Sequence, residues 1–94
     1  MLKLVWRPEA QSDLETIISY IAERNPAAAQ ELRSVIGTCA ERLPEHPYIY
    51  RSGRIPGTRE AVVHPNYILI YEVRADTIEV MSIIHSRRQY PPGE

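Results

Sequence analysis

Cysteine is almost absent from this 94-residue chain, since it occurs only at Cys39. A single cysteine can form neither an internal disulfide nor a zinc site by itself. Long apolar runs are also missing, and the longest cover only a few residues, too few to cross a bilayer. The first residues lack the apolar region and the cleavage site of a signal peptide. These absences predict a cytoplasmic protein with no membrane partner.

The motifs of common cofactor, metal and hydrolase sites are missing as well. The three histidines, His46, His64 and His85, are far apart and follow no metal-ligand spacing. The chain has no GxSxG, P-loop or GxGxxG motif, so nothing indicates a serine hydrolase or a nucleotide-binding protein. Cys39 lies on the apolar stripe of a helical segment, which favours a small buried residue over a nucleophile. We expect no cofactor and no metal.

Lysine is rare, and the charge is nearly balanced. Eleven basic and twelve acidic residues give a formal net charge of -1 at pH 7, so the surface as a whole should not attract nucleic acid. All six basic residues between positions 48 and 94 are arginines. Five of them form two short clusters: Arg51, Arg54, Arg59, Arg87 and Arg88. Because the planar guanidinium suits carboxylates and phosphates, these clusters predict a local surface for an anionic ligand.

Hydrophobic periodicity predicts one strand and two helices in the first half. Residues 2–6 alternate like a short strand. Pro8 suits the first turn of a helix over residues 8–24, and Asn25-Pro26 is a start signal for a second helix over 26–43. The short junction between two amphipathic helices predicts an antiparallel helical hairpin.

The second half has the period of strands. We expect strands at Thr58–His64, Tyr67–Val73 and Thr77–Ile84, joined by two short turns. Tyr67–Val73 is apolar on both faces, which predicts a central strand. The order β-α-α-β-β-β indicates an α+β fold, in which the antiparallel helical hairpin packs on a small twisted antiparallel sheet. At this length, residues 1–94 form a single domain.

The residues left for chemistry lie at strand ends and in the arginine clusters. They are Arg51, Arg54, Arg59, His64, His85, Arg87, Arg88 and Tyr90. A metal-free ribonuclease needs a base, an acid and cations around the phosphate, and histidine, tyrosine and arginine can fill these roles. The alternative is that the arginines are solvated and the histidines are turn residues.

The order and spacing of these motifs resemble the RelE/ParE superfamily of toxins over essentially the whole chain. The residues that carry the resemblance are Asp13-Leu14, Ile17, Tyr20-Ile21, Pro56-Gly57-Thr58-Arg59-Glu60, His64-Pro65-Asn66-Tyr67, Tyr71, His85, Arg88 and Tyr90-Pro91. The resemblance implies the toxin of a type II toxin–antitoxin module, which arrests bacterial growth unless a cognate antitoxin binds it in a hetero-oligomer. An apolar groove beside the helical hairpin, flanked by Arg54 and Arg59, would suit an acidic amphipathic antitoxin segment that folds on binding.

The superfamily implies two different targets. ParE-like members inhibit DNA gyrase and have no assigned enzymatic site, whereas RelE-like members cleave mRNA on the ribosome with basic residues on the sheet. The long hairpin, the scarcity of lysine and a central strand with Arg74 alone beyond its end favour the ParE-like target. The expected residues for antitoxin or target binding are Arg51, Arg54, Arg59, His64, Arg87 and Arg88.

Two alternatives stay open at this point. In a RelE-like endoribonuclease, the catalytic candidates are Arg59, His85, Arg87 and Tyr90. A non-toxic or inactivated binding domain of the same fold is the other alternative, and it predicts no growth arrest on expression.

Overall fold

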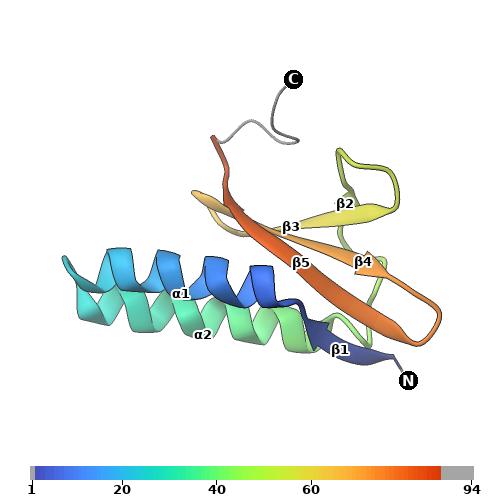
Figure 1. The fold of residues 1–94 in the computed structure, drawn as a ribbon, viewed down its shortest axis with the longest axis horizontal. Helices are drawn as coiled ribbons and strands as arrows, with labels where there is room; N and C mark the ends of the chain where they lie inside the picture. The colour runs from blue at the N-terminus through green and yellow to red at the C-terminus, as the bar shows by residue number, and fades with distance from the viewer. Residues whose placement is uncertain (1, 88–94) are drawn as a thin grey trace.

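The computed structural model describes residues 2–87, and it places two helices side by side against one face of a five-stranded sheet (Figure 1). The elements are β1 (Lys3–Trp6), α1 (Pro8–Ala22), α2 (Pro26–Arg42), β2 (Arg51–Ser52), β3 (Thr58–His64), β4 (Tyr67–Val73) and β5 (Thr77–His85). The strand order is β1-β5-β4-β3-β2, so β4 is the central strand. The predicted α+β class, the helical hairpin and the central position of Tyr67–Val73 are confirmed.

Local signals explain where the helices begin and end. Proline occupies the start of both helices, where its missing N–H has no partner to lose. The Asn25 side chain caps α2 by accepting a hydrogen bond from the Ala28 N–H at 3.0 Å. The two helices are also joined by a bidentate ion pair, in which Arg33 donates to both carboxylate oxygens of Glu15 at 2.9 and 3.0 Å. α1 ends two residues earlier than the periodicity predicts, because the turn into Asn25-Pro26 begins there.

The main core lies between the helical hairpin and the sheet. Ile36 and Leu43 from α2 and its C-cap are fully buried against the sheet residues Leu69 and Tyr71. A smaller apolar cluster, formed by Ile68, Ile70 and Ile84 with Met81, is separate from this core. The two clusters explain why the sequence of β4 is apolar at nearly every position, as expected for a central strand.

The sheet differs from the prediction in two respects. It is mixed rather than entirely antiparallel, because β1 pairs in parallel with β5 in the register Lys3↔Thr77 to Trp6↔Val80. It also contains the two-residue strand β2, which pairs with β3 and lies in the segment that the sequence marks only as turns. Alternation identifies a strand but not its neighbour, and β1 and β5 are at opposite ends of the sequence.

α1 protects the part of β5 that β1 does not reach. β1 pairs with β5 only as far as Val80. Beyond that point, the Asp13 carboxylate accepts hydrogen bonds from the Ile83 N–H at 3.0 Å and from the Ser82 hydroxyl at 2.8 Å. A carboxylate on a helix therefore satisfies a backbone N–H that a further strand would otherwise bind. Within residues 2–87, neither helix has the length and apolar character needed to cross a membrane.

Candidate functional site

The predicted site residues fall into two groups at opposite ends of the sheet. Arg59 lies opposite Tyr71 in the β3–β4 pair, whereas His85 lies opposite Tyr67 in the β4–β5 pair. Tyr71 and Tyr67 are four positions apart on β4, which corresponds to roughly 13 Å along the strand. The structure thus does not bring Arg59 and His85 into one catalytic cluster. Arg88 and Tyr90 lie outside the described residues.

Arg51 and Arg54 surround a buried carboxylate. Glu60 on β3 is only 2% exposed, and its Oε1 accepts a hydrogen bond from Arg51 Nη2 at 3.1 Å. Its Oε2 accepts the Arg54 backbone N–H at 3.0 Å and lies 3.5 Å from Arg54 Nε. Both side chains are thus engaged within the protein. Glu60 belongs to the motif that carries the family resemblance but not to the predicted site residues, although its position between arginines and a β-prone run was a possible signal.

A tight turn brings these groups together. The Thr58 N–H donates to the Ile55 carbonyl at 3.1 Å, and Gly57 has a φ of +88°. Proline followed by a glycine with positive φ is typical of a type II turn, so the Pro56-Gly57 pair determines the conformation here. On the opposite side of the turn, the Gly53 N–H donates to the Thr58 carbonyl at 2.7 Å, and a Cβ at Gly53 would collide with the Thr58 hydroxyl.

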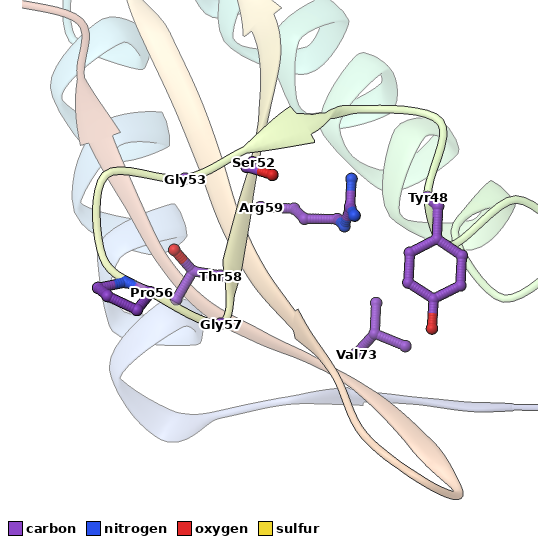
Figure 2. Close-up of a pocket in the computed structure, with 8 residues that line it drawn as sticks. All are labelled: Tyr48, Ser52, Gly53, Pro56, Gly57, Thr58, Arg59 and Val73. Atoms are coloured by element: carbon purple, nitrogen blue, oxygen red, sulfur yellow. The ribbon is translucent and has the colours of Figure 1, made fainter.

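Arg59 lies in a pocket of about 420 Å³ that opens beside this turn (Figure 2). Figure 2 shows its side chain extending toward the Tyr48 ring, with Val73 of the neighbouring strand beside them. Arg59 Nη1 donates to the Tyr50 carbonyl at 2.7 Å, and its Cζ is 4.8 Å from the centre of the Tyr48 ring. The predicted anion-binding arginine therefore holds the segment between α2 and β2 in place.

Tyr71 holds the same segment from the core. Its hydroxyl donates to the Pro47 carbonyl at 2.8 Å, and its ring packs edge-on against Tyr50 at 6.4 Å between centroids. Burial raises the pKa of Tyr71 to about 12 and outweighs the opposite effect of the nearby Arg59 charge. Tyr50 is held by a further contact, since Cys39 Sγ lies 3.6 Å from its hydroxyl, and this contact together with burial raises the pKa of Tyr50. The arrangement supports structure rather than proton transfer near neutral pH.

The two histidines form a row with Tyr67 at the other end of the sheet. The Tyr67 ring centroid is 5.7 Å from that of His64 and 5.5 Å from that of His85. His64 Nδ1 accepts the Asn66 N–H at 3.0 Å, and His85 Nδ1 accepts the Arg87 N–H at 3.1 Å. Because both Nδ1 atoms accept a hydrogen bond, the neutral form of each ring carries its proton on Nε2.

Grooves run along both helices. One, of about 350 Å³, lies between α1 and the ends of β4 and β5 and is lined by Ile17, Tyr20, Tyr67, Ile83 and His85, among others. The other consists of two adjoining pockets of about 340 Å³ each along α2, which share Val35 and Val63. Neither groove is lined by Arg54 or Arg59, and Arg59 lines the separate pocket beside the turn instead.

The central strand offers little positive charge. Arg74, which follows β4, forms ion pairs with Glu72 at 2.6 Å and with Glu79 at 3.4 Å. Among residues 2–87, no three histidine, cysteine or acidic side chains come together as metal ligands would. What the arrangement offers is a pair of grooves beside the helices, and its arginines are mostly engaged within the protein.

Comparisons with known proteins identify the family of this chain. Residues 4–90 match the family model described as the ParE toxin of the type II toxin–antitoxin system parDE. Two relatives are each 34% identical over 90 residues: Y4kP from Sinorhizobium fredii, over 95% of this chain and 93% of the relative, and Toxin RelE2 from Caulobacter vibrioides, over 94% and 99%.

Solved structures have the same fold. A chain of the chromosomal ParDE system from P. aeruginosa superposes with a TM-score of 0.80 at 19% identity, covering 90% of this chain and 96% of that one. A YoeB/ParE toxin from Agrobacterium tumefaciens superposes with a TM-score of 0.64 at 17% identity, covering 89% and 98%. From the family match and the two relatives, we conclude that this chain belongs to the ParE toxin family of type II toxin–antitoxin systems, within the RelE/ParE superfamily.

Proposed function

We propose that this toxin arrests growth by inhibiting DNA gyrase and that a cognate antitoxin neutralises it in a hetero-oligomeric complex. The observation that supports this most is how the arginines are used. Arg51 and Arg54 bind Glu60, and Arg59 binds the Tyr50 carbonyl. A nuclease must direct its cations at the phosphate of the substrate, and these side chains are engaged with the protein instead.

The separation of the candidate groups supports the same proposal. Arg59 and His85 lie roughly 13 Å apart along the strand direction, too far to act on one phosphate. Arg74 is held between Glu72 and Glu79, so it adds no free positive charge beside the central strand. A toxin with this surface is better suited to binding a protein target than to competing for RNA phosphates in physiological salt.

One observation favours the alternative, a ribosome-dependent mRNA endoribonuclease. His85 and Arg87 adjoin each other at the end of β5, and His85 Nδ1 accepts the Arg87 N–H. His85 could then act through Nε2, with the Arg87 guanidinium near a substrate phosphate. The relative from Caulobacter vibrioides also carries the name RelE2.

Expression in growing bacteria distinguishes the two targets. A gyrase inhibitor should arrest growth with a DNA damage response and with gyrase trapped covalently on DNA. An mRNA endoribonuclease should instead produce cuts within translated messages and no trapped gyrase. The matched control is coexpression of the antitoxin, which should restore growth in both cases. Loss of translated mRNA without trapped gyrase would contradict the proposed target.

A further inference from the structure

Tyr48 and Ile49 are the two most exposed large apolar residues in the part of the chain that the structure describes, at 65% and 62%. They end the turn of residues 46–49, in which the Ile49 N–H donates to the His46 carbonyl at 3.2 Å. Single exposed apolar residues are ordinary, but two neighbours enlarge the apolar surface that faces water. Burying both side chains against another molecule would recover the free energy lost by this exposure.

The main chain on both sides of this pair is fixed to the sheet. The Tyr71 hydroxyl donates to the Pro47 carbonyl at 2.8 Å, and Arg59 Nη1 donates to the Tyr50 carbonyl at 2.7 Å. Both acceptors belong to the backbone, so the two bonds hold the main chain and leave the side chains between them exposed. A surface that is already ordered loses less conformational entropy on binding, which increases affinity.

The charge beside the turn indicates the chemistry of the partner. Tyr48 lines the pocket that contains Arg59, and Val73 adds apolar surface next to them (Figure 2). Arg59 is the one charged residue in the lining of this pocket, and within residues 2–87 no carboxylate forms an ion pair with it. A positive charge beside exposed apolar side chains is complementary to an apolar cleft with a carboxylate at its rim.

The 46–49 turn is separate from the two grooves along the helices. It follows the end of α2, and neither Tyr48 nor Ile49 is among the residues that line the grooves. A segment bound along a groove would therefore leave these two side chains available to a different protein. The surface that binds the target and the surface that binds the antitoxin can then be altered one at a time.

We propose that DNA gyrase binds the toxin at the 46–49 turn and the adjoining Arg59 pocket. Tyr48 and Ile49 enter an apolar cleft of gyrase, and a carboxylate at the rim of that cleft lies beside the Arg59 guanidinium. Tyr48 is the principal anchor, as buried tyrosines commonly are in protein interfaces. The inference depends on the proposed inhibition of gyrase, and it adds the surface and the chemistry of the contact.

The test is supercoiling inhibition and calorimetric binding with purified gyrase. The double variant Tyr48→Ala/Ile49→Ser should require at least about tenfold more toxin for half inhibition and should bind gyrase at least about tenfold more weakly. The matched control is Tyr20→Ala, which removes a tyrosine that is 57% exposed on α1 and should inhibit gyrase as the parent chain does. Urea unfolding verifies that each variant folds, and calorimetry with the antitoxin encoded beside this chain should give unchanged affinity for the double variant.

Two further variants separate the parts of the contact. Ile49→Ser alone leaves the contact between Arg59 and the Tyr48 ring in place, and it should weaken gyrase binding by about threefold or more. Arg59→Gln keeps an N–H donor for the Tyr50 carbonyl and removes the charge, so it should also weaken binding by about threefold or more. Unchanged gyrase binding by Arg59→Gln would overturn the assigned carboxylate.

The outcomes separate the inference from the function beneath it. A folded parent toxin that leaves gyrase fully active would overturn the proposed function. Equal inhibition by the parent chain and the double variant would overturn the inference and leave gyrase inhibition intact. A double variant that loses antitoxin binding but still inhibits gyrase would show that the antitoxin occupies the turn. A toxin dimer that the double variant abolishes would show that a second copy does, and either result would overturn the inference. Weaker gyrase binding with unchanged antitoxin binding would support it.

Discussion

The carboxylate of Glu60 is buried beside the guanidinium of Arg51, with Arg51 Nη2 at 3.1 Å from Glu60 Oε1. The two residues are directly opposite each other in the β2–β3 pair. The same carboxylate also accepts the Arg54 N–H, so one side chain satisfies both the short strand and the turn after it. A residue of this kind stabilises the local conformation that carries the predicted binding arginines.

Replacing Glu60 tests that role. Glu60→Ala removes the acceptor of the Arg54 N–H and both ion pairs, and we expect it to lower the free energy of unfolding by about 1–3 kcal/mol. Glu60→Gln keeps an acceptor oxygen and should lower the free energy of unfolding by less than Glu60→Ala does. Urea denaturation of both variants measures the difference. Equal stability of Glu60→Ala and the parent chain would show that the cluster contributes nothing.

Arg59 contacts the Tyr50 carbonyl and the Tyr48 ring, and we propose that it also binds the antitoxin; a pair of variants can separate these two roles. The sequence predicts that Arg59→Glu weakens the complex with the antitoxin more than it perturbs folding. Because Arg59→Glu also removes the contacts to the Tyr50 carbonyl and the Tyr48 ring, we expect it to lower the free energy of unfolding by about 1–2 kcal/mol. Tyr48→Ala, which removes the ring and keeps the arginine, is the matched control. Calorimetry of binding and urea unfolding should be measured on both. A variant Arg59→Glu with unchanged affinity would remove Arg59 from the binding surface.

Much of the fold could be predicted from the sequence because its signals are local. Proline at Pro8 and Pro26, the Asn25 cap and the apolar period predict the helical hairpin, and the alternation of Tyr67–Val73 predicts the central strand. The parallel pairing of β1 with β5 could not be predicted, because it joins residues more than 70 positions apart. Strand alternation carries no information about such a neighbour.

The candidate site was harder to predict for the same reason. A cluster of arginines in sequence indicates an anionic ligand, but whether that ligand is external depends on which carboxylates the fold brings near. Glu60 and the Tyr50 carbonyl take up three of these arginines. Local sequence also cannot show that Arg59 and His85 are at opposite ends of β4, which follows from strand pairing alone.

Tyr71 gives a prediction for alkaline pH. Its pKa is about 12 in the folded chain and near 10 when unfolded, so the folded state holds the phenolic proton more tightly. The corresponding stability is fully present below pH 10 and is lost as the pH rises toward 12, with a magnitude of about 2–3 kcal/mol. The free energy of unfolding, measured with urea between pH 9 and 12, should therefore fall less steeply with pH for Tyr71→Phe than for the parent chain.

Tyr71→Phe also has an effect at neutral pH. It removes the hydrogen bond to the Pro47 carbonyl and should cost about 1 kcal/mol there. The control is Tyr20→Phe, since Tyr20 is exposed on α1. An identical pH dependence of the parent chain and Tyr71→Phe would contradict this explanation of the raised pKa.

The most direct measurement for the central claim is a DNA supercoiling assay with purified gyrase and purified toxin. The account predicts that the toxin inhibits supercoiling, that the His85→Ala/Arg87→Ala double variant inhibits it equally, and that addition of the antitoxin restores gyrase activity. Full gyrase activity in the presence of folded toxin, together with ribosome-dependent mRNA cleavage that the double variant abolishes, would contradict it.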